Sequence, residues 1–170
     1  MTSALETSVR KFTADPAAGR IAPKVTATLV GGRAQLSTGP FSWECDLPTA
    51  VGGSNQSPSP TAYLLGALAA CAVVFVRDTL APEFDVEATD VNATAGCTAD
   101  LGGLLGVAGT RSDLGELRVE ISITSPSPAD RIEALRRAWL ARCPIYLALR
   151  DANDVAVTFT VARPSAGNGS

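Results

Sequence analysis

The sequence of 170 residues predicts an α+β domain with the element order βββ-α-ββ-αα-β. Three observations support this fold class. Short segments near both ends alternate apolar and polar residues, which is typical of strands. A long apolar stretch follows a Ser/Pro-rich loop, and a second helical pattern is interrupted by a Cys-Pro pair. We expect one domain over residues 21–163, a loosely ordered arm at residues 1–20 and a flexible tail at residues 164–170.

The first three strands are predicted by alternation and by glycines between them. Lys24–Val30 places Val25, Ala27 and Leu29 on one face. Gly31-Gly32 then predicts a tight hairpin into Arg33–Ser37, because two-residue turns require positive φ. After the Gly39-Pro40 turn, the segment of residues 41–46 alternates as a third strand.

The first long helix is predicted to begin at Pro60. Ser59 precedes it and is suited to cap the helix, while proline is favoured in the first turn. We expect the helix to run to about Leu80 and to be stopped by Pro82. The stretch is apolar on nearly every side, so we expect it to be buried inside the protein or its oligomer.

The remaining elements follow from alternation and from one apolar stripe. Ile132, Leu135, Trp139 and Leu140 recur at helical spacing, and Cys143-Pro144 interrupts that helix. The expected elements are a strand over Val86–Cys97, a Gly-rich loop over Ala99–Gly115, a strand over Leu117–Thr124, a helix from Ser127, a short helix over Ile145–Arg150 and a last strand over Val155–Val161.

Composition excludes several classes of function. The 14 Lys+Arg against 17 Asp+Glu leave a net charge of −3, so we expect neither a nucleic-acid partner nor an anionic membrane partner. There is no histidine, which excludes His-dependent triads and His-ligated metals. The first residues hold no unbroken apolar segment, and the run Tyr63–Val76 is shorter than the ~20 residues that span a bilayer. We expect a cytoplasmic protein whose cysteines are thiols.

The four cysteines are the remaining candidates for reactive chemistry. No Cys-x-x-Cys pair occurs, so a metal site is not expected. Cys71 lies mid-helix among small apolar residues, and two interpretations stay open: an inert buried thiol, or a nucleophile that needs a nearby cation. Cys143 is predicted at a helix N-cap, where the helix dipole lowers a thiol pKa, or it only marks a helix break. Cys45 and Cys97 fall in strand patterns, where packing explains them best.

Other candidate groups are explained most simply as solvated surface. Glu44 and Asp46 share one strand face, and Arg136-Arg137 lies on a helix. The Gly102-Gly103 loop lacks the strand-to-helix setting of a phosphate-binding motif.

Two motifs resemble signatures of the OsmC/Ohr family. The first comprises Asp46-Leu47-Pro48, Gly52-Gly53, Pro58-Ser59-Pro60 and the run from Leu64 to Cys71. The second is Cys143-Pro144, near the end of a later helix.

The resemblance implies an intertwined homodimer with central cysteine-bearing helices. It implies a thiol peroxidase, free of metal and cofactor, that reduces alkyl or fatty-acid hydroperoxides in oxidative-stress defence. Cys71 matches the peroxidatic position and Cys143 the resolving position, with a disulfide between them as the product of turnover. An external dithiol, lipoyl-type in some members, restores the thiols.

One position departs from the family pattern. Active members carry an acidic residue directly after the signature proline, and here that position is Thr61. That acid pairs with an arginine from the N-terminal strands, for which Arg33 is the candidate, and the arginine stabilises the thiolate. Because Thr61 has no charge, a second reading is an OsmC-like protein that binds an apolar small molecule or is a divergent thiol protein without peroxidase activity.

Overall fold

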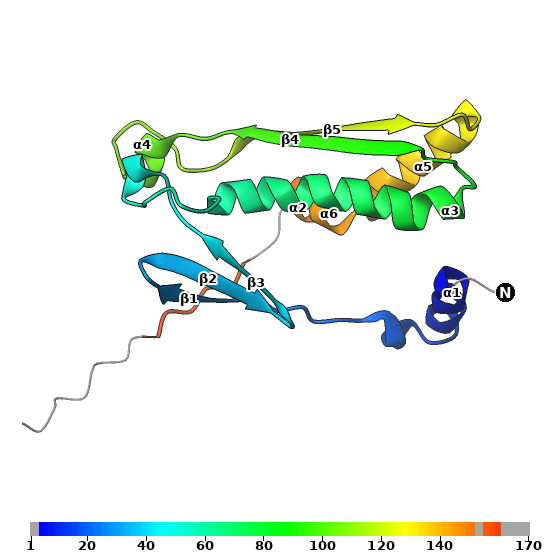
Figure 1. The fold of residues 1–170 in the computed structure, drawn as a ribbon, viewed down its shortest axis with the longest axis horizontal. Helices are drawn as coiled ribbons and strands as arrows, with labels where there is room; N and C mark the ends of the chain where they lie inside the picture. Colours follow the sequence, from blue (N-terminus) through cyan, green and yellow to red (C-terminus); the bar gives the residue numbers. More distant parts are fainter. Residues whose placement is uncertain (1–3, 152–154, 161–170) are drawn as a thin grey trace, which may run out of the picture.

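The computed structural model describes residues 4–151 and 155–160 and confirms the α+β class. Two antiparallel sheets form, one from β1, β2 and β3 and one from β4 and β5. The second sheet lies along the long helix α2, with α5 and α6 beside it (Figure 1). We call α2 to α3, β4, β5, α5 and α6 the cysteine layer, and β1–β3 the N-terminal sheet.

The N-terminal sheet forms as the sequence predicted. Its strands are β1 (Thr26–Val30), β2 (Arg33–Thr38) and β3 (Phe41–Cys45), in that spatial order. Gly31 and Gly32 make the β1–β2 turn at φ 57° and 82°, which is the left-handed conformation that a two-residue hairpin needs. A short 3₁₀ helix, η2 (Thr49–Val51), lies in the loop that follows β3.

The long helix begins where it was expected and ends later. In α2 (Pro60–Phe75), the Ser59 hydroxyl accepts the Ala62 N–H at 3.2 Å. A π-helical turn, η3 (Val76–Leu80), and α3 (Ala81–Glu83) continue it without a break (Figure 1). Pro82 does not stop the helix, because the π turn places it in the first turn of α3, where its missing N–H is tolerated.

The combined helix is longer than the apolar run in the sequence indicated. Over Pro60–Glu83 it is long and apolar enough to cross a bilayer by length and composition, and it carries Arg77 and Asp78. One side of it packs on the β4–β5 sheet and against α6, as the core of a layered domain does.

The second sheet pairs β4 (Asp90–Thr98) with β5 (Gly115–Thr124). Ala93 lies opposite Ile121, and the pairing shifts between Gly96 and Thr98. A single-turn helix, α4 (Leu101–Leu104), lies in the Gly-rich connection. The strand predicted from Val86 begins only at Asp90, where pairing with Thr124 of β5 starts; α3 and the turn after it end at Asp85, and residues 86–89 connect them to the strand.

The predicted break at the Cys-Pro pair is confirmed. The helix α5 (Ala129–Arg142) ends at Cys143, whose ψ of 112° is extended, and α6 (Pro144–Arg150) starts on the next residue. The core sits between these helices, η3 and the sheet. Its buried members are Ala72, Val76, Leu80, Ala81, Val86, Leu135, Trp139 and Cys143.

At the chain ends, the arm expected over residues 1–20 stays a prediction, and the predicted last strand is wrong. The arm contains α1 (Ala4–Ala14), in which Leu5, Val9 and Phe12 recur at helical spacing, and a 3₁₀ helix, η1 (Pro16–Gly19), and neither helix has a buried residue. Residues 155–160 form no strand, since no described strand pairs with them. Val161 and the predicted tail at residues 164–170 lie outside the described residues.

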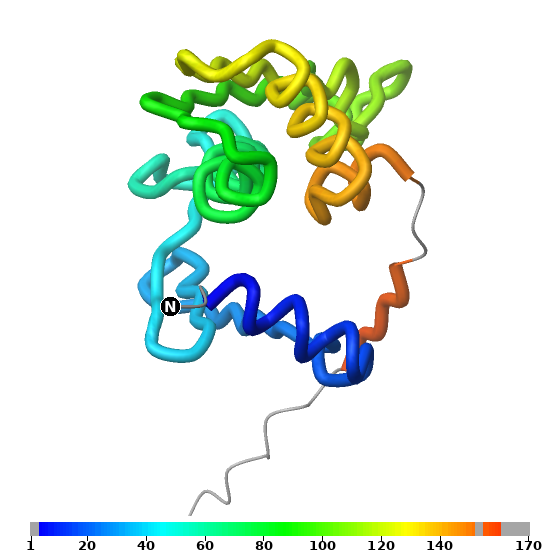
Figure 2. Tube along the Cα trace, turned by 90° about the vertical axis from the view of Figure 1, so that its right-hand side faces the viewer, coloured from blue at the N-terminus to red at the C-terminus, as the bar shows by residue number. Residues whose placement is uncertain are grey.

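The N-terminal sheet stands apart from the cysteine layer. Figure 2 shows this sheet and α1 on one side and α2, α5 and the β4–β5 sheet on the other. The contact between them is made near the start of α2, where the Trp43 and Tyr63 rings lie 6.4 Å apart. Every residue of β1 is exposed, including Leu29 at 82%. The expected burial of the long helix is therefore only partial in one chain: Leu68 and Ala72 are buried, and Val74 is 46% exposed.

Candidate functional site: a pair of neighbouring thiols

The structure brings Cys71 and Cys143 together. Their sulfurs are 3.3 Å apart although the residues are 72 positions apart in sequence, and the Cys143 S–H donates to the Cys71 sulfur. Both are free thiols. Cys71 comes from the middle of α2 and Cys143 from the junction of α5 and α6.

Cys143 is fixed by backbone hydrogen bonds on both sides of the helix break. Its N–H donates to the Trp139 carbonyl at 2.9 Å, closing α5, and its carbonyl accepts the Leu147 N–H at 3.0 Å, opening α6. The side chain is fully buried, with 0% exposure. The predicted N-cap position of Cys143 is therefore confirmed, and its sulfur is held against α2.

The surroundings of Cys71 favour the thiol over the thiolate. Burial raises the pKa of Cys71 to about 11, and the neighbouring Cys143 adds to the shift. The Ile145 backbone N–H, in the first turn of α6, acts against this shift and lowers the pKa. The sequence did not reveal this donor, because it reaches Cys71 through tertiary packing. Within one chain, Cys71 is thus protonated at neutral pH and needs a further positive group to become a nucleophile.

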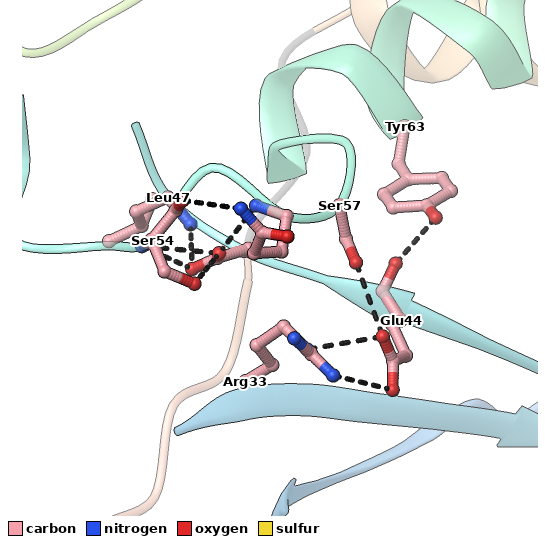
Figure 3. Close-up of polar contacts among 8 residues, drawn as sticks. Arg33, Glu44, Leu47, Ser54, Ser57 and Tyr63 are labelled. Carbon is pink, nitrogen blue, oxygen red and sulfur yellow. Dashed lines mark hydrogen bonds and ion pairs between the residues drawn. The ribbon is translucent and has the colours of Figure 1, made fainter. Parts of the chain in front are cut away.

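Arg33 is held by Glu44 rather than by Cys71. Its Nε lies 3.1 Å from Glu44 Oε2 in an ion pair, and its Nη2 donates to Oε1 at 3.4 Å (Figure 3). Ser57 donates to the same carboxylate at 3.4 Å, and the Tyr63 hydroxyl donates to the Glu44 carbonyl at 2.6 Å. Within residues 4–151 and 155–160, no hydrogen bond or ion pair joins Arg33 to Cys71.

The carboxylate that pairs with Arg33 therefore comes from Glu44 of β3. The position on α2 where the family pattern has an acidic residue is Thr61, which carries no charge. Thr61 is the second residue of α2 and is half-buried. Sequence analysis explained Glu44 as solvated surface. It is partly exposed, but it anchors Arg33 and the loop that leads to α2.

Asp46 was also expected on a solvated face, and this prediction is wrong. Its side chain is only 7% exposed. It accepts hydrogen bonds from the Leu47 N–H at 2.7 Å, the Gln56 N–H at 3.0 Å, and the Ser54 hydroxyl and N–H at 2.6 Å and 3.2 Å. The Gln56 N–H, followed by the Ser54 hydroxyl, holds the pKa of this carboxyl well below its usual range.

Asp46 thereby folds the loop of residues 47–57 back on β3. A Cβ at Gly53 would overlap the Leu47 carbonyl, so only glycine allows this close approach. The aspartate followed by a Gly/Ser/Asn-rich loop is the sequence signal that could have predicted this role.

The other two cysteines fit the packing interpretation. Cys45 is buried on β3 opposite Ala34, and Cys97 is half-buried on β4. Within the part of the chain that the structure describes, no three Cys, Asp or Glu residues are grouped to hold a metal ion.

Comparison with known proteins places the chain in a family. The family described as OsmC-like protein matches residues 53–158, which is more than half of the sequence. An OsmC-like protein from Mycoplasma pneumoniae has a similar structure, with a TM-score of 0.63, 20% identity and coverage of 76% of this chain and 88% of that one. No curated protein sequence matches the chain significantly.

Two further solved structures share the fold. One is described as an organic hydroperoxide resistance protein OsmC from Legionella pneumophila, with a TM-score of 0.58, 20% identity and coverage of 76% of this chain and 90% of that one. The other is described as an osmotic stress induced and detoxification response protein from Psychrobacter arcticus 273-4, with a TM-score of 0.57, 15% identity and coverage of 75% and 88%. The family match, the α+β fold shared with these structures and the paired cysteines agree, and the chain belongs to the OsmC-like protein family.

Proposed function

We propose that this OsmC-like protein is a thiol-dependent peroxidase that reduces organic hydroperoxides in the cytoplasm. The observation that carries the proposal is the 3.3 Å separation of the Cys71 and Cys143 sulfurs, both reduced and both held by the core. The chain shares its fold with a Legionella pneumophila protein described as an organic hydroperoxide resistance protein, and this likeness supports the proposed class of substrate.

The chemistry requires two thiols and no metal. The Cys71 thiolate attacks the terminal peroxide oxygen, the O–O bond breaks, and the alkoxide takes a proton and leaves as an alcohol. Cys71 is then a sulfenic acid. The Cys143 sulfur attacks it, the S–O bond breaks, and water leaves as the disulfide forms. A dithiol reductant, for example of the lipoyl type, returns both residues to thiols by exchange and is itself oxidised to a disulfide.

The proposal includes a homodimer, because one chain leaves both its N-terminal sheet and the thiol site incomplete. Apolar side chains of that sheet are exposed: Leu29 at 82%, Phe41 at 68% and Val30 at 52%. Burying such a surface stabilises an association by about 25 cal/mol per Å² of apolar area removed from water. Intertwining of two copies covers this sheet with a cysteine layer and brings an Arg33 guanidinium to the Cys71 thiolate.

The rival function is small-molecule binding without peroxidase turnover. Two observations favour it: position 61 has no carboxylate, and the pKa of Cys71 in a single chain is about 11. A thiol with that pKa is almost entirely protonated at neutral pH.

Peroxide consumption separates the two functions. With tert-butyl hydroperoxide and a lipoyl dithiol, we expect catalytic turnover by the wild-type protein and none by Cys71→Ser. In the absence of the dithiol, Cys143→Ser should still reduce about one peroxide per chain but keep a sulfenic acid where the wild type forms a disulfide, because the variant has no second thiol beside Cys71. Cys97→Ser is the matched control and should turn over at the wild-type rate. Equal consumption by wild type and Cys71→Ser, or none by either, would refute the peroxidase.

A further inference from the structure

The loop of residues 99–114 presents an exposed apolar surface, which we call the knob. The knob includes α4, and four of its aliphatic side chains are largely exposed: Leu101 at 45%, Leu104 at 56%, Leu105 at 60% and Val107 at 54%. Single exposed apolar residues are normal on a monomer, but four of them within seven residues indicate an interaction surface.

The knob is held in one conformation by its own backbone. The Asp100 carboxylate accepts the Gly102 N–H at 2.8 Å, and the Gly102 carbonyl accepts the Val107 N–H at 2.9 Å. A Cβ at Gly103 would overlap the Arg111 backbone, so only glycine lets the two sides of the loop meet. Because the loop is already closed, a partner that binds it loses little affinity to ordering the backbone.

A cavity of about 640 Å³, which we call the hollow, lies between α1 and the elements η3, α3 and α5. Its lining is mainly apolar and includes Leu5, Val9, Thr79 and Pro82. No residue of α1 is buried, and Val9 is 57% exposed, so one chain leaves this lining open.

The unpaired charges of the two surfaces have opposite signs. In the knob, Arg111 pairs with Asp113 at 2.8 Å, and the Asp100 carboxylate has no ion-pair partner among the described residues. In the hollow, Glu6 already has an interaction within the chain, whereas the Arg10 side chain forms no hydrogen bond or ion pair with the described residues. The two other charged residues that line the hollow, Glu83 and Arg142, pair with each other at 2.9 Å. A free carboxylate on the knob therefore complements a free guanidinium at the hollow.

The knob and the hollow lie at opposite ends of the long helix (Figure 1). The α4 turn contacts η2, in the loop that leads into α2, whereas η3 and α3 form one wall of the hollow where the helix ends. The knob therefore does not reach the hollow of its own chain. Between the two ends, α2 has an exposed face at Ala62, Gly66, Ala70 and Val74. A two-fold axis across that face reverses the helix and exchanges its two ends.

From these features we infer that the knob of one chain fills the hollow of a second copy, with Asp100 of one chain beside Arg10 of the other. Two-fold symmetry makes this contact twice, so the pair closes and does not grow into a filament. The inference rests on the homodimer of the proposed function and assigns it a contact surface that the thiol chemistry does not use.

Coexpression of two variant chains tests the contact directly. One chain carries Leu104→Cys in the knob, and the other carries Val9→Cys in the hollow. We expect a short bismaleimide to link the two chains, with peptide mapping assigning the link to positions 104 and 9. Neither variant expressed alone should link two copies of its new cysteine. Coexpression of Leu104→Cys with Ser122→Cys, at an exposed position of β5, is the control and should give no link between the new cysteines.

Sedimentation of further variants tests what the contact contributes to association. Leu105→Asp places a charge in the apolar contact and should weaken self-association about tenfold or more. Ser122→Asp makes the same change of charge on β5 and should leave association unchanged. Asp100→Arg and Arg10→Asp should each weaken association, and their combination should restore it.

Several results would overturn the inference. A dimer without the link between positions 104 and 9, or equal association of wild type and Leu105→Asp, would remove this contact and leave the proposed homodimer standing. A link between two copies of Leu104→Cys would mean that knob packs on knob, and links within large assemblies of mixed size would contradict the two-fold pairing. A monomeric wild-type protein would overturn the homodimer and this contact together. Failure of peroxide turnover would affect none of these measurements.

Discussion

The cysteine layer and the N-terminal sheet differ in how completely one chain buries them. The cysteine layer holds the main core cluster, with Leu80 and Cys143 at 0% exposure and Leu135 at 1%. In the N-terminal sheet, β1 is exposed along its whole length. The two regions are joined mainly through Tyr63 and the loop after β3 (Figures 1 and 2).

This difference divides the proposed chemistry between the two regions. The cysteine layer of one chain is sufficient to bring two sulfurs within reach of a disulfide. The same burial makes Cys71 hard to ionise. The cation proposed to correct this is Arg33, which belongs to the N-terminal sheet and is paired there with Glu44. Each prediction below breaks or sharpens this contrast.

Truncating one leucine in each region should give the largest difference. Leu135→Ala leaves a cavity in the cysteine layer and should lower the free energy of unfolding by about 2–5 kcal/mol. Leu29→Ala removes the same atoms from an exposed position and should cost under about 0.5 kcal/mol in a single chain. Urea denaturation measures both.

In the proposed dimer, Leu29→Ala should cost more unfolding free energy than it does in a single chain. If two copies cover β1, the effect of Leu29→Ala should grow with protein concentration, and sedimentation should show weaker self-association. A concentration-independent effect on a monomeric wild-type protein would contradict the dimer.

In the proposed dimer the Arg33 guanidinium lowers the pKa of Cys71, so removing this guanidinium should raise that pKa again. An adjacent opposite charge lowers a pKa by about 1–3 units, so Arg33→Ala should reduce the thiolate fraction at pH 7 by about tenfold to a thousandfold. The pH profile of Cys71 alkylation measures this, and in the variant it should approach the pKa of about 11 that a single chain gives. Glu44→Gln keeps the guanidinium and should have a smaller effect. Identical profiles for wild type and Arg33→Ala would contradict the role of Arg33.

The loop after β3 should be sensitive to acid. The folded pKa of Asp46 is depressed below its unfolded value of about 4, so its stabilising effect is present above that pH and is lost as the pH falls below it. Asp46→Asn should therefore lose less stability between pH 7 and pH 3 than the wild type. Urea midpoints at the two pH values test this, and parallel shifts in both proteins would show that Asp46 is not the titrating group.

The smallest effect is expected at the start of α2. Ser59→Ala removes the acceptor for the Ala62 N–H and should cost about 1 kcal/mol of unfolding free energy. Ser42→Ala, on an exposed position of β3, is the control and should cost almost nothing. A cost shared equally by both variants would mean that the cap contributes no stability.

Elements with local signals could be predicted from sequence. The Gly31-Gly32 turn, the Ser59 cap and the Cys143-Pro144 break each depend on neighbouring residues, and each is confirmed. The continuation past Pro82 was not predicted, because the π turn before it is not encoded in apolar spacing. The last strand failed because strand formation needs a pairing partner, and the described strands of one chain supply none.

The two cysteines of the site could be predicted from the sequence, but the roles of its charged residues could not. Cys71 and Cys143 stand in recognisable motifs. The roles of Glu44 and Asp46 arise from the β2–β3 register and from a loop that folds back, so both looked like solvated surface in the sequence. The Ile145 N–H is a donor to Cys71 only because α6 packs against α2.

The most direct test of the account is the covalent state of the protein after one equivalent of tert-butyl hydroperoxide. The account predicts that intact mass falls by two hydrogens and that peptide mapping finds Cys71 linked to Cys143, with Cys45 and Cys97 still reduced. Unchanged mass with four free thiols, or a link through Cys45 or Cys97, would contradict it.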